Sequence, residues 1–68
     1  MNARYDVVRF YRDARVRQRV VLRTVTLEQA QDHCNDPETS SVTATSAAAR
    51  ARTRRVGEWF DGYRRSAG

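Results

Sequence analysis

Large apolar side chains are scarce in this chain, and their scarcity limits what it can fold into. Across 68 residues they comprise eight Val, two Leu, two Phe, one Trp and three Tyr. A domain of this size buries only about 60% of the surface of its unfolded chain, so this stock covers one face of a small sheet and little more. The sequence therefore predicts one small domain over residues 1–68, of marginal stability, for which self-association into a homo-oligomer stays open.

All thirteen basic residues are arginine, and the formal net charge is +5 at pH 7. Lysine and isoleucine are both absent, whereas alanine and valine together supply seventeen positions. Because Lys and Ile need A- or U-rich codons, this composition indicates a GC-rich genome rather than selection for bidentate arginine contacts. The placement of charge is more informative, since residues 26–41 carry four carboxylates and no arginine between two basic segments. This acidic segment argues against a uniform polyanion-binding surface.

The first basic segment has the pattern of a β-hairpin. Tyr5–Tyr11 and Val16–Val25 are rich in valine and aromatic residues, and residues 12–15 form the predicted turn. An odd loop would set Arg9 opposite Arg19, a destabilising like-charge pair, so we favour the even register. In that register the core face carries Tyr5, Val7, Tyr11, Val16, Val20 and Leu22, and the other face carries Phe10, Arg17, Arg19 and Arg23.

A first short helix is predicted after the hairpin. Thr26 and Gln29 occupy the two positions of a capping box. Pro37 disfavours a helical conformation at the preceding residue, which places the end of this helix near Asn35. Asp36 and Pro37 can then start a further turn. The spacing predicts a buried stripe made of Leu27, Ala30 and Cys34.

A second helix is expected from about residue 45 to 56. Alanine-rich sequence favours it, Thr45 or Ser46 can cap it, and Gly57 is a suitable stop. Its small residues predict a side that lies close against the sheet, formed by Ala44, Ala47, Ala48 and Ala51. Arg50 and Arg54 share one side of this helix, whereas Arg52 and Arg55 point elsewhere.

The closing segment Trp59–Tyr63 predicts a third strand against the hairpin, with Trp59 or Phe60 in the core. Side chains alternate along a strand, so the other member of this pair should face outward. The whole chain is thus expected to be α+β: a small antiparallel sheet, formed by the N-terminal hairpin and a C-terminal strand, packed with two short helices in the order β-β-α-α-β.

Several segments resemble a family of very small basic proteins encoded by phages of high-GC actinobacteria, as in mycobacteriophages. The resemblance rests on residues 26–41, on Thr43–Thr45 and on the closing Trp59–Tyr63. Similar proteins tend to have Asp-Gly at the hairpin turn, where this chain has Asp13-Ala14. The family has no assigned activity, so the resemblance implies only an accessory phage product that works in the cytoplasm of a host bacterium.

We expect neither catalysis nor a bound metal or cofactor. His33 and Cys34 are about 100° apart on a helix and poorly disposed for a thiolate–imidazole pair. Cys34 is expected to pack as a small apolar residue, and His33 to be exposed or to donate to a loop. The chain has one histidine and one cysteine, and its N-terminus lacks the apolar run of a signal peptide. A lone thiol suits a reducing compartment, and no stretch is long enough to span a bilayer.

Two binding hypotheses remain, with a self-assembling structural piece as a third. The first, which the family resemblance favours, is docking on a host or phage protein through a surface of arginine and aromatic side chains. The second is nucleic-acid binding on the basic sheet face, a track that Arg50, Arg54, Arg64 and Arg65 would extend. The candidate contact residues are Phe10, Arg17, Arg19, Arg23, Arg50, Arg54, Trp59 and Tyr63.

Overall fold

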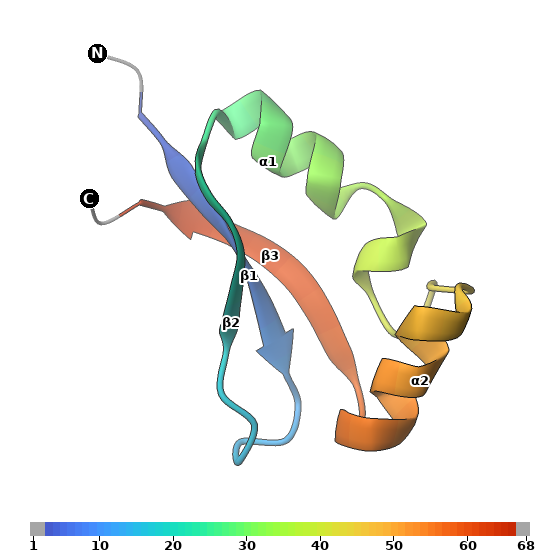
Figure 1. The fold of residues 1–68 in the computed structure, drawn as a ribbon. Coiled ribbons are helices and arrows are strands. Elements are labelled where there is room, and N and C mark those ends of the chain that lie inside the picture. Colours follow the sequence, from blue (N-terminus) through green and yellow to red (C-terminus); the bar gives the residue numbers. More distant parts are fainter. Residues whose placement is uncertain (1–2, 67–68) are drawn as a thin grey trace.

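A three-stranded antiparallel sheet forms one layer of the molecule, and the helices form the other (Figure 1). The structure, a computed structural model, describes residues 3–66. Its elements are β1 (Tyr5–Tyr11), β2 (Arg19–Val25), α1 (Leu27–Cys34), a 3₁₀ turn (Pro37–Thr39), α2 (Ala47–Val56) and β3 (Trp59–Arg65). The strands lie in the order β2-β1-β3, so β1 is central. The predicted α+β fold and its element order are confirmed.

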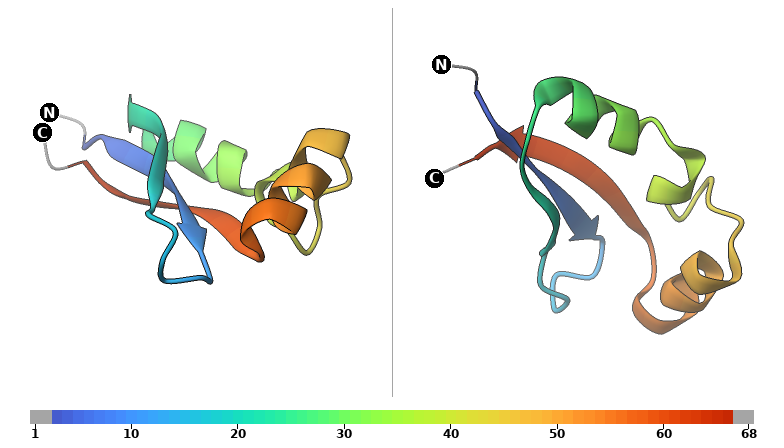
Figure 2. Two further views of the ribbon diagram at one scale, coloured as in Figure 1. Left: turned by 60° about the horizontal axis from the view of Figure 1, so that its bottom comes forward. Right: turned by 45° about the horizontal axis from the view of Figure 1, so that its top comes forward.

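The two faces of the sheet differ in what covers them. Both helices lie on the same side, as the two views in Figure 2 show. Residues directly opposite each other in an antiparallel pair share a face, so the β1–β3 register assigns each side chain. The helix-covered face carries Tyr5, Val7, Arg9 and Tyr11 with Trp59, Asp61, Tyr63 and Arg65. The opposite face, here called the open face, carries Asp6, Val8 and Phe10 with Phe60, Gly62 and Arg64.

The apolar core is as thin as the composition predicts. Its buried members are Val7, Val8, Ala30, Ala49 and Trp59, in a molecule that measures 41 × 24 × 14 Å. α1 begins at the predicted capping box on Thr26 and is capped at its end by Asn35. Ala30 is buried as expected, but Leu27 remains 40% exposed, so the predicted stripe is only partly correct.

α2 contacts the sheet through a different side from the predicted one. Ala47, Ala48 and Ala51 are exposed, and Ala49 is the buried alanine. The reason is that α2 packs beside the end of β3, where Thr53 accepts a hydrogen bond from the indole Nε1 of Trp59 at 3.0 Å. The helix limits agree with expectation, since Ser46 caps it and Gly57 ends it at φ +82°.

The predicted hairpin register is wrong. Arg9 lies opposite Arg19, Val8 opposite Val20 and Val7 opposite Leu22. The like-charge pair is tolerated because Arg9 turns to the other neighbouring strand, where Asp61 accepts two of its hydrogen bonds, at 2.7 and 3.0 Å. Val20 therefore belongs to the open face rather than to the core face. The second strand also starts three residues later than predicted, and Val16 lies in the loop.

Two irregularities change the register between β1 and β2 toward the far end of the hairpin. The register shifts between Tyr5 and Val7 and again between Val7 and Val8, as β-bulges produce. At the first shift Thr24 adopts φ +51°, an uncommon conformation for a β-branched residue. Its backbone N–H donates to Asp6 Oδ1 at 3.0 Å, which gives the buried Asp6 carboxylate a partner and holds the bulge in place.

A buried carboxylate joins both sheet and helix. The Asp61 side chain is fully buried, and it accepts from Arg9 and from His33 Nε2 at 3.0 Å. The hydrogen bonds from Arg9 to Asp61 raise the pKa of the Arg9 guanidinium. The prediction that His33 is exposed or donates to a loop is wrong, because its partner Asp61 lies on β3 and the His33 side chain is only 27% exposed.

The indole of Trp59 lies between two guanidinium groups. The Cζ atoms of Arg9 and Arg52 are 4.8 and 4.7 Å from its ring centroid. Such cation–π contacts contribute about 0.5–2 kcal/mol each, more as water is excluded. Burial lowers the pKa of the Arg52 guanidinium. Arg52 thereby covers an aromatic residue that the few apolar side chains cannot enclose.

Glu38 orders the segment between the two helices. Its carboxylate accepts from the backbone N–H groups of Thr45 at 2.7 Å and Ser46 at 3.0 Å. A hydrogen bond with the Ser46 side chain has the largest effect and, together with these backbone hydrogen bonds, lowers the pKa of Glu38 from 4.5 to about 2. The predicted turn at Asp36 and Pro37 is present, with Asp36 as its cap.

Removing the charge of Asp61 should unfold much of the population. Asp61→Asn leaves Arg9 buried without a counter-charge, which typically costs about 3–5 kcal/mol. We expect the urea midpoint, followed by circular dichroism, to fall sharply. The control is Asp32→Asn on the exposed side of α1, which should change the free energy of unfolding by less than about 0.5 kcal/mol. Equal midpoints for the two variants would contradict the role of Asp61.

Acid should release the start of α2 in a defined pH range. Because the folded-state pKa of Glu38 lies below its ordinary value, its stabilising effect is complete above about pH 4.5 and is lost as the pH falls toward 2. The backbone amide signals of Thr45 and Ser46 should titrate near pH 2 by NMR, and this titration should vanish in Glu38→Gln. A midpoint at 4.5 would show that these hydrogen bonds do not form.

Candidate nucleic-acid interface

Two phenylalanine rings are stacked on the open face of the sheet. Phe10 on β1 and Phe60 on β3 are directly opposite each other. Their ring centroids are 5.3 Å apart with an angle of 27° between the planes. Phe60 is 54% exposed, whereas Phe10 is half-buried. We call this pair the aromatic platform.

A glycine makes room for the platform. A Cβ atom at Gly62 would lie 3.1 Å from Cε2 of Phe10 and 3.8 Å from Cε2 of Phe60, so the Phe10 ring lies directly over this residue. Gly62 is opposite Val8, which is fully buried although no helix covers this face. The Phe10 ring thus occupies the space that a side chain at position 62 would fill.

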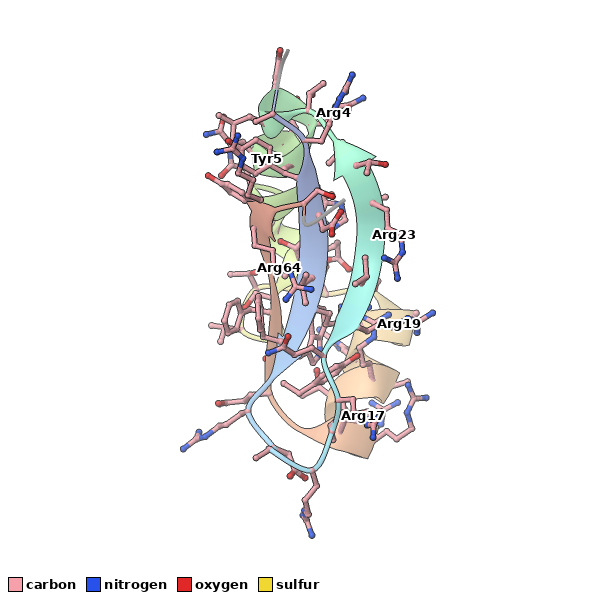
Figure 3. The ribbon with its side chains drawn as sticks, turned by 90° about the vertical axis from the view of Figure 1, so that its left-hand side faces the viewer. Arg4, Tyr5, Arg17, Arg19, Arg23 and Arg64 are labelled. Atoms are coloured by element: carbon pink, nitrogen blue, oxygen red, sulfur yellow. The ribbon has the colours of Figure 1, made fainter. Side chains whose placement is uncertain are left out.

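Four exposed arginines border the open face: Arg17, Arg19, Arg23 and Arg64, which we call the arginine rim. In Figure 3 the helices lie behind the sheet and Arg64 lies in front of the strands. Arg19 and Arg23 project beyond the outer edge of β2 in the same view, and Arg17 lies further toward the hairpin loop. Within residues 3–66, none of the four forms an ion pair with a carboxylate.

Carboxylates are segregated from this face. Asp6, the acidic residue among its strand positions, is 8% exposed and is already bonded to Thr24. The acidic segment 26–41 forms α1 and the 3₁₀ turn, and α1 packs on the opposite side of the sheet. Asp13 pairs with Arg15 and Glu58 with Arg12 in the loops. The positive charge of the rim is thus unopposed locally, which the charge order along the chain did not predict.

A groove lies beside the exposed edge of the platform. Its volume is about 330 Å³, and it extends from Tyr11 and Phe60 to the loop that carries Ser41 and Val42. Arg12 and Glu58 form its polar side, with Arg12 Nη1 donating to Glu58 Oε2 at 2.9 Å. A second groove of about 350 Å³ lies on α2, lined by Arg50 and Arg54, and Ser41 borders both grooves.

The structure separates the predicted contact residues. Phe10, Arg17, Arg19 and Arg23 lie on or beside the open face, although Arg19 shares the side of Arg9 at the sheet edge. Arg50 and Arg54 are on α2 and face the second groove. The prediction is wrong for Trp59, which is 2% exposed. Tyr63 lies on the helix-covered face, where it meets Tyr5 edge to face at 6.0 Å and Gln31 donates to its hydroxyl.

Phe60 was missing from the predicted contact residues, and Arg64 was predicted only as an extension of the basic track. Both follow from the alternation of β3 once Trp59 is known to face the helices, since positions 60, 62 and 64 then face the other way. The expected outward-facing aromatic is Phe60.

The only histidine and cysteine do not form a reactive pair. His33 Nε2 is engaged by Asp61, and burial, with a smaller effect of the Asp61 charge, raises the pKa of the Cys34 thiol. A raised pKa keeps the thiol protonated and weakly nucleophilic. Over residues 3–66, no three His, Cys, Asp or Glu side chains gather closely enough to hold a metal ion. In the same range, no helix has the length and apolar character to cross a membrane.

Comparison with known protein families, with curated proteins and with solved structures finds no match for this chain. The resemblance to a phage family therefore stays a prediction.

A side chain at position 62 should disturb the platform. Gly62→Ala places a methyl group against the Phe10 ring, which must shift by a few tenths of an ångström; an off-rotamer displacement of the ring costs about 0.5–1.5 kcal/mol. We expect the nuclear Overhauser contacts between the Phe10 and Phe60 rings to weaken and the urea midpoint to fall slightly. Unchanged ring contacts would show that Gly62 does not set the position of Phe10.

Proposed function

We propose that this protein is a non-catalytic binding module that takes single-stranded nucleic acid on the open face of its sheet. The observation that carries the proposal is a half-exposed aromatic pair on the open face, bordered by the arginine rim, whose four members have no carboxylate partner within residues 3–66. Arg64 belongs to the open face itself, and Arg19 lies at the sheet edge on the side of Arg9. Sheet faces with exposed aromatic rings and a basic border are used by single-strand binders for base stacking and phosphate contact.

A single strand fits this face better than a duplex. The faces of duplex bases are already stacked on one another, whereas an unpaired base can lie on an exposed ring such as Phe60. Figure 3 shows Arg19 and Arg23 projecting beyond the edge of β2 and Arg64 in front of the strands. Phosphates next to a stacked base would meet guanidinium groups of this rim.

A protein partner is the second candidate, and it is the one that the family resemblance favours. Phe60 and Val42 are 54% and 82% exposed and both border the first groove. Exposed aromatic residues beside arginine are the composition of interaction hot spots. A partner of this kind would be a host or phage protein with an acidic surface, because the rim is positive. Retention of one protein from a lysate after nuclease treatment would favour it over nucleic acid.

Binding of short oligonucleotides should depend on salt and on the platform. Affinity measured by fluorescence anisotropy should fall roughly tenfold or more between about 50 and 200 mM salt if a few phosphates are contacted. Phe60→Ala should weaken binding about fivefold or more, the usual effect of losing one stacking ring. Because Phe60 is half-exposed, this variant should keep its fold by circular dichroism.

Two adjacent arginines provide the matched control. Arg64→Ala and Arg65→Ala remove the same charge from neighbouring positions of β3, but the two side chains belong to opposite faces. Arg64→Ala should weaken oligonucleotide binding at least about threefold more than Arg65→Ala. It should also reduce the slope of log affinity against log salt concentration by about one, the effect of losing one phosphate contact. Equal effects would mean that net charge alone attracts the strand, and no binding by the wild type would reject the proposal.

A further inference from the structure

We infer that the groove beside Phe60 holds one unstacked nucleobase of the bound strand. This inference rests on the proposed function and adds a specific site to it. The groove is continuous with the aromatic platform, because Phe60 belongs to both. A strand that stacks one base on Phe60 therefore brings its next base to the mouth of the groove.

The size of the groove suits a single flat ring system. Its volume of about 330 Å³ is at the lower end of the range for small-molecule sites. Tyr11 and Phe60 line it from the strands, and Val42 lines it from the loop. Ser41 fixes that loop to β3, since its backbone N–H donates to the Trp59 carbonyl at 2.9 Å and its Oγ accepts from the Trp59 N–H at 3.1 Å. The wall that carries Val42 is thus attached to the sheet.

The polar side of the groove matches the edge of a base. Arg12 is 80% exposed and uses one nitrogen for Glu58, while Glu58 is 58% exposed and uses one oxygen. Each therefore keeps hydrogen-bonding groups for a ligand. Base edges present donors and acceptors side by side, and arginine and glutamate are among the side chains that read them. An aliphatic side chain of a protein partner would use none of these remaining donors and acceptors, so hydrogen-bond complementarity favours the base.

The path of the bound nucleic acid beyond the first groove follows from the position of the second groove on α2. Arg50 and Arg54 are one turn apart on α2 and line a groove that shares Ser41 with the first. They supply two adjacent positive charges where the phosphate after the inserted base would lie. The bound strand would thus run from Arg64 across Phe60, past Val42 and toward α2.

NMR with the wild-type protein tests this site directly. The probes are a short oligodeoxythymidylate and an abasic sugar–phosphate strand of equal length. A base in the groove should shift the Val42 methyl signals upfield through its ring current and give nuclear Overhauser contacts from base protons to these methyl groups. The abasic strand should leave the Val42 methyl signals unchanged, although it contacts the arginines.

Truncation of Val42 measures how much the loop side of the groove contributes to nucleic-acid binding. Val42→Ala should weaken binding of the oligodeoxythymidylate roughly twofold to fivefold, less than the loss of a whole stacking ring, and should leave binding of the abasic strand unchanged. Val42 is 82% exposed, so its truncation should not affect folding. Leu27→Ala is the matched control, because Leu27 is an exposed apolar residue on α1, outside both grooves.

The outcomes separate this inference from the proposed function. If the oligonucleotide shifts the signals of Phe60 and Arg64 but not those of Val42, the module binds nucleic acid and the base site is wrong. An equal loss of affinity for both strands in Val42→Ala would also overturn the site, because the effect would then not depend on a base. If neither strand shifts any signal, the proposed function fails and the inference fails with it.

Discussion

The carboxylate of Asp61 is the interaction on which the rest of this structure depends. It lies on β3, it holds Arg9 on the central strand by two hydrogen bonds, and it accepts a third from His33 on α1. Any shift that separated these groups would leave a charge buried and unpaired, at a cost of several kcal/mol. With only five buried apolar residues among those described, hydrophobic packing could not select this arrangement so strongly. The ion pair therefore sets the strand register and the position of α1 together.

The same interaction decides which side chains reach the surface. Because Asp61 must face the helices, its neighbours Phe60 and Gly62 face the other way. Phe60 then stacks on Phe10, and Gly62 gives the Phe10 ring the space it occupies. A buried polar contact on one face of the sheet thus generates an aromatic platform on the other, so structure and proposed function share one cause.

Local features of the fold were predictable from the sequence, whereas its long-range pairing was not. The limits of β1, the capping box at Thr26 and the stop at Gly57 depend on neighbouring residues, and each agrees with the structure. The hairpin register was wrong because it was judged on β1 and β2 alone, and the partner that neutralises Arg9 is 52 positions away. Trp59 was misassigned to the contact surface for a related reason, since Arg52 and Thr53 on α2 enclose it.

Charge order along the chain and charge order in space lead to opposite conclusions. In the sequence, residues 26–41 interrupt the arginines and weaken the case for a polyanionic partner. In the structure that segment is folded onto the far side of the sheet, and Glu38 uses its charge to hold the start of α2. The acidic residues therefore stabilise the helical layer without opposing the rim. Since exposed charges are screened within about 10 Å at ordinary ionic strength, an anion approaching the open face responds mainly to the nearby arginines, and the net charge of the chain understates its attraction.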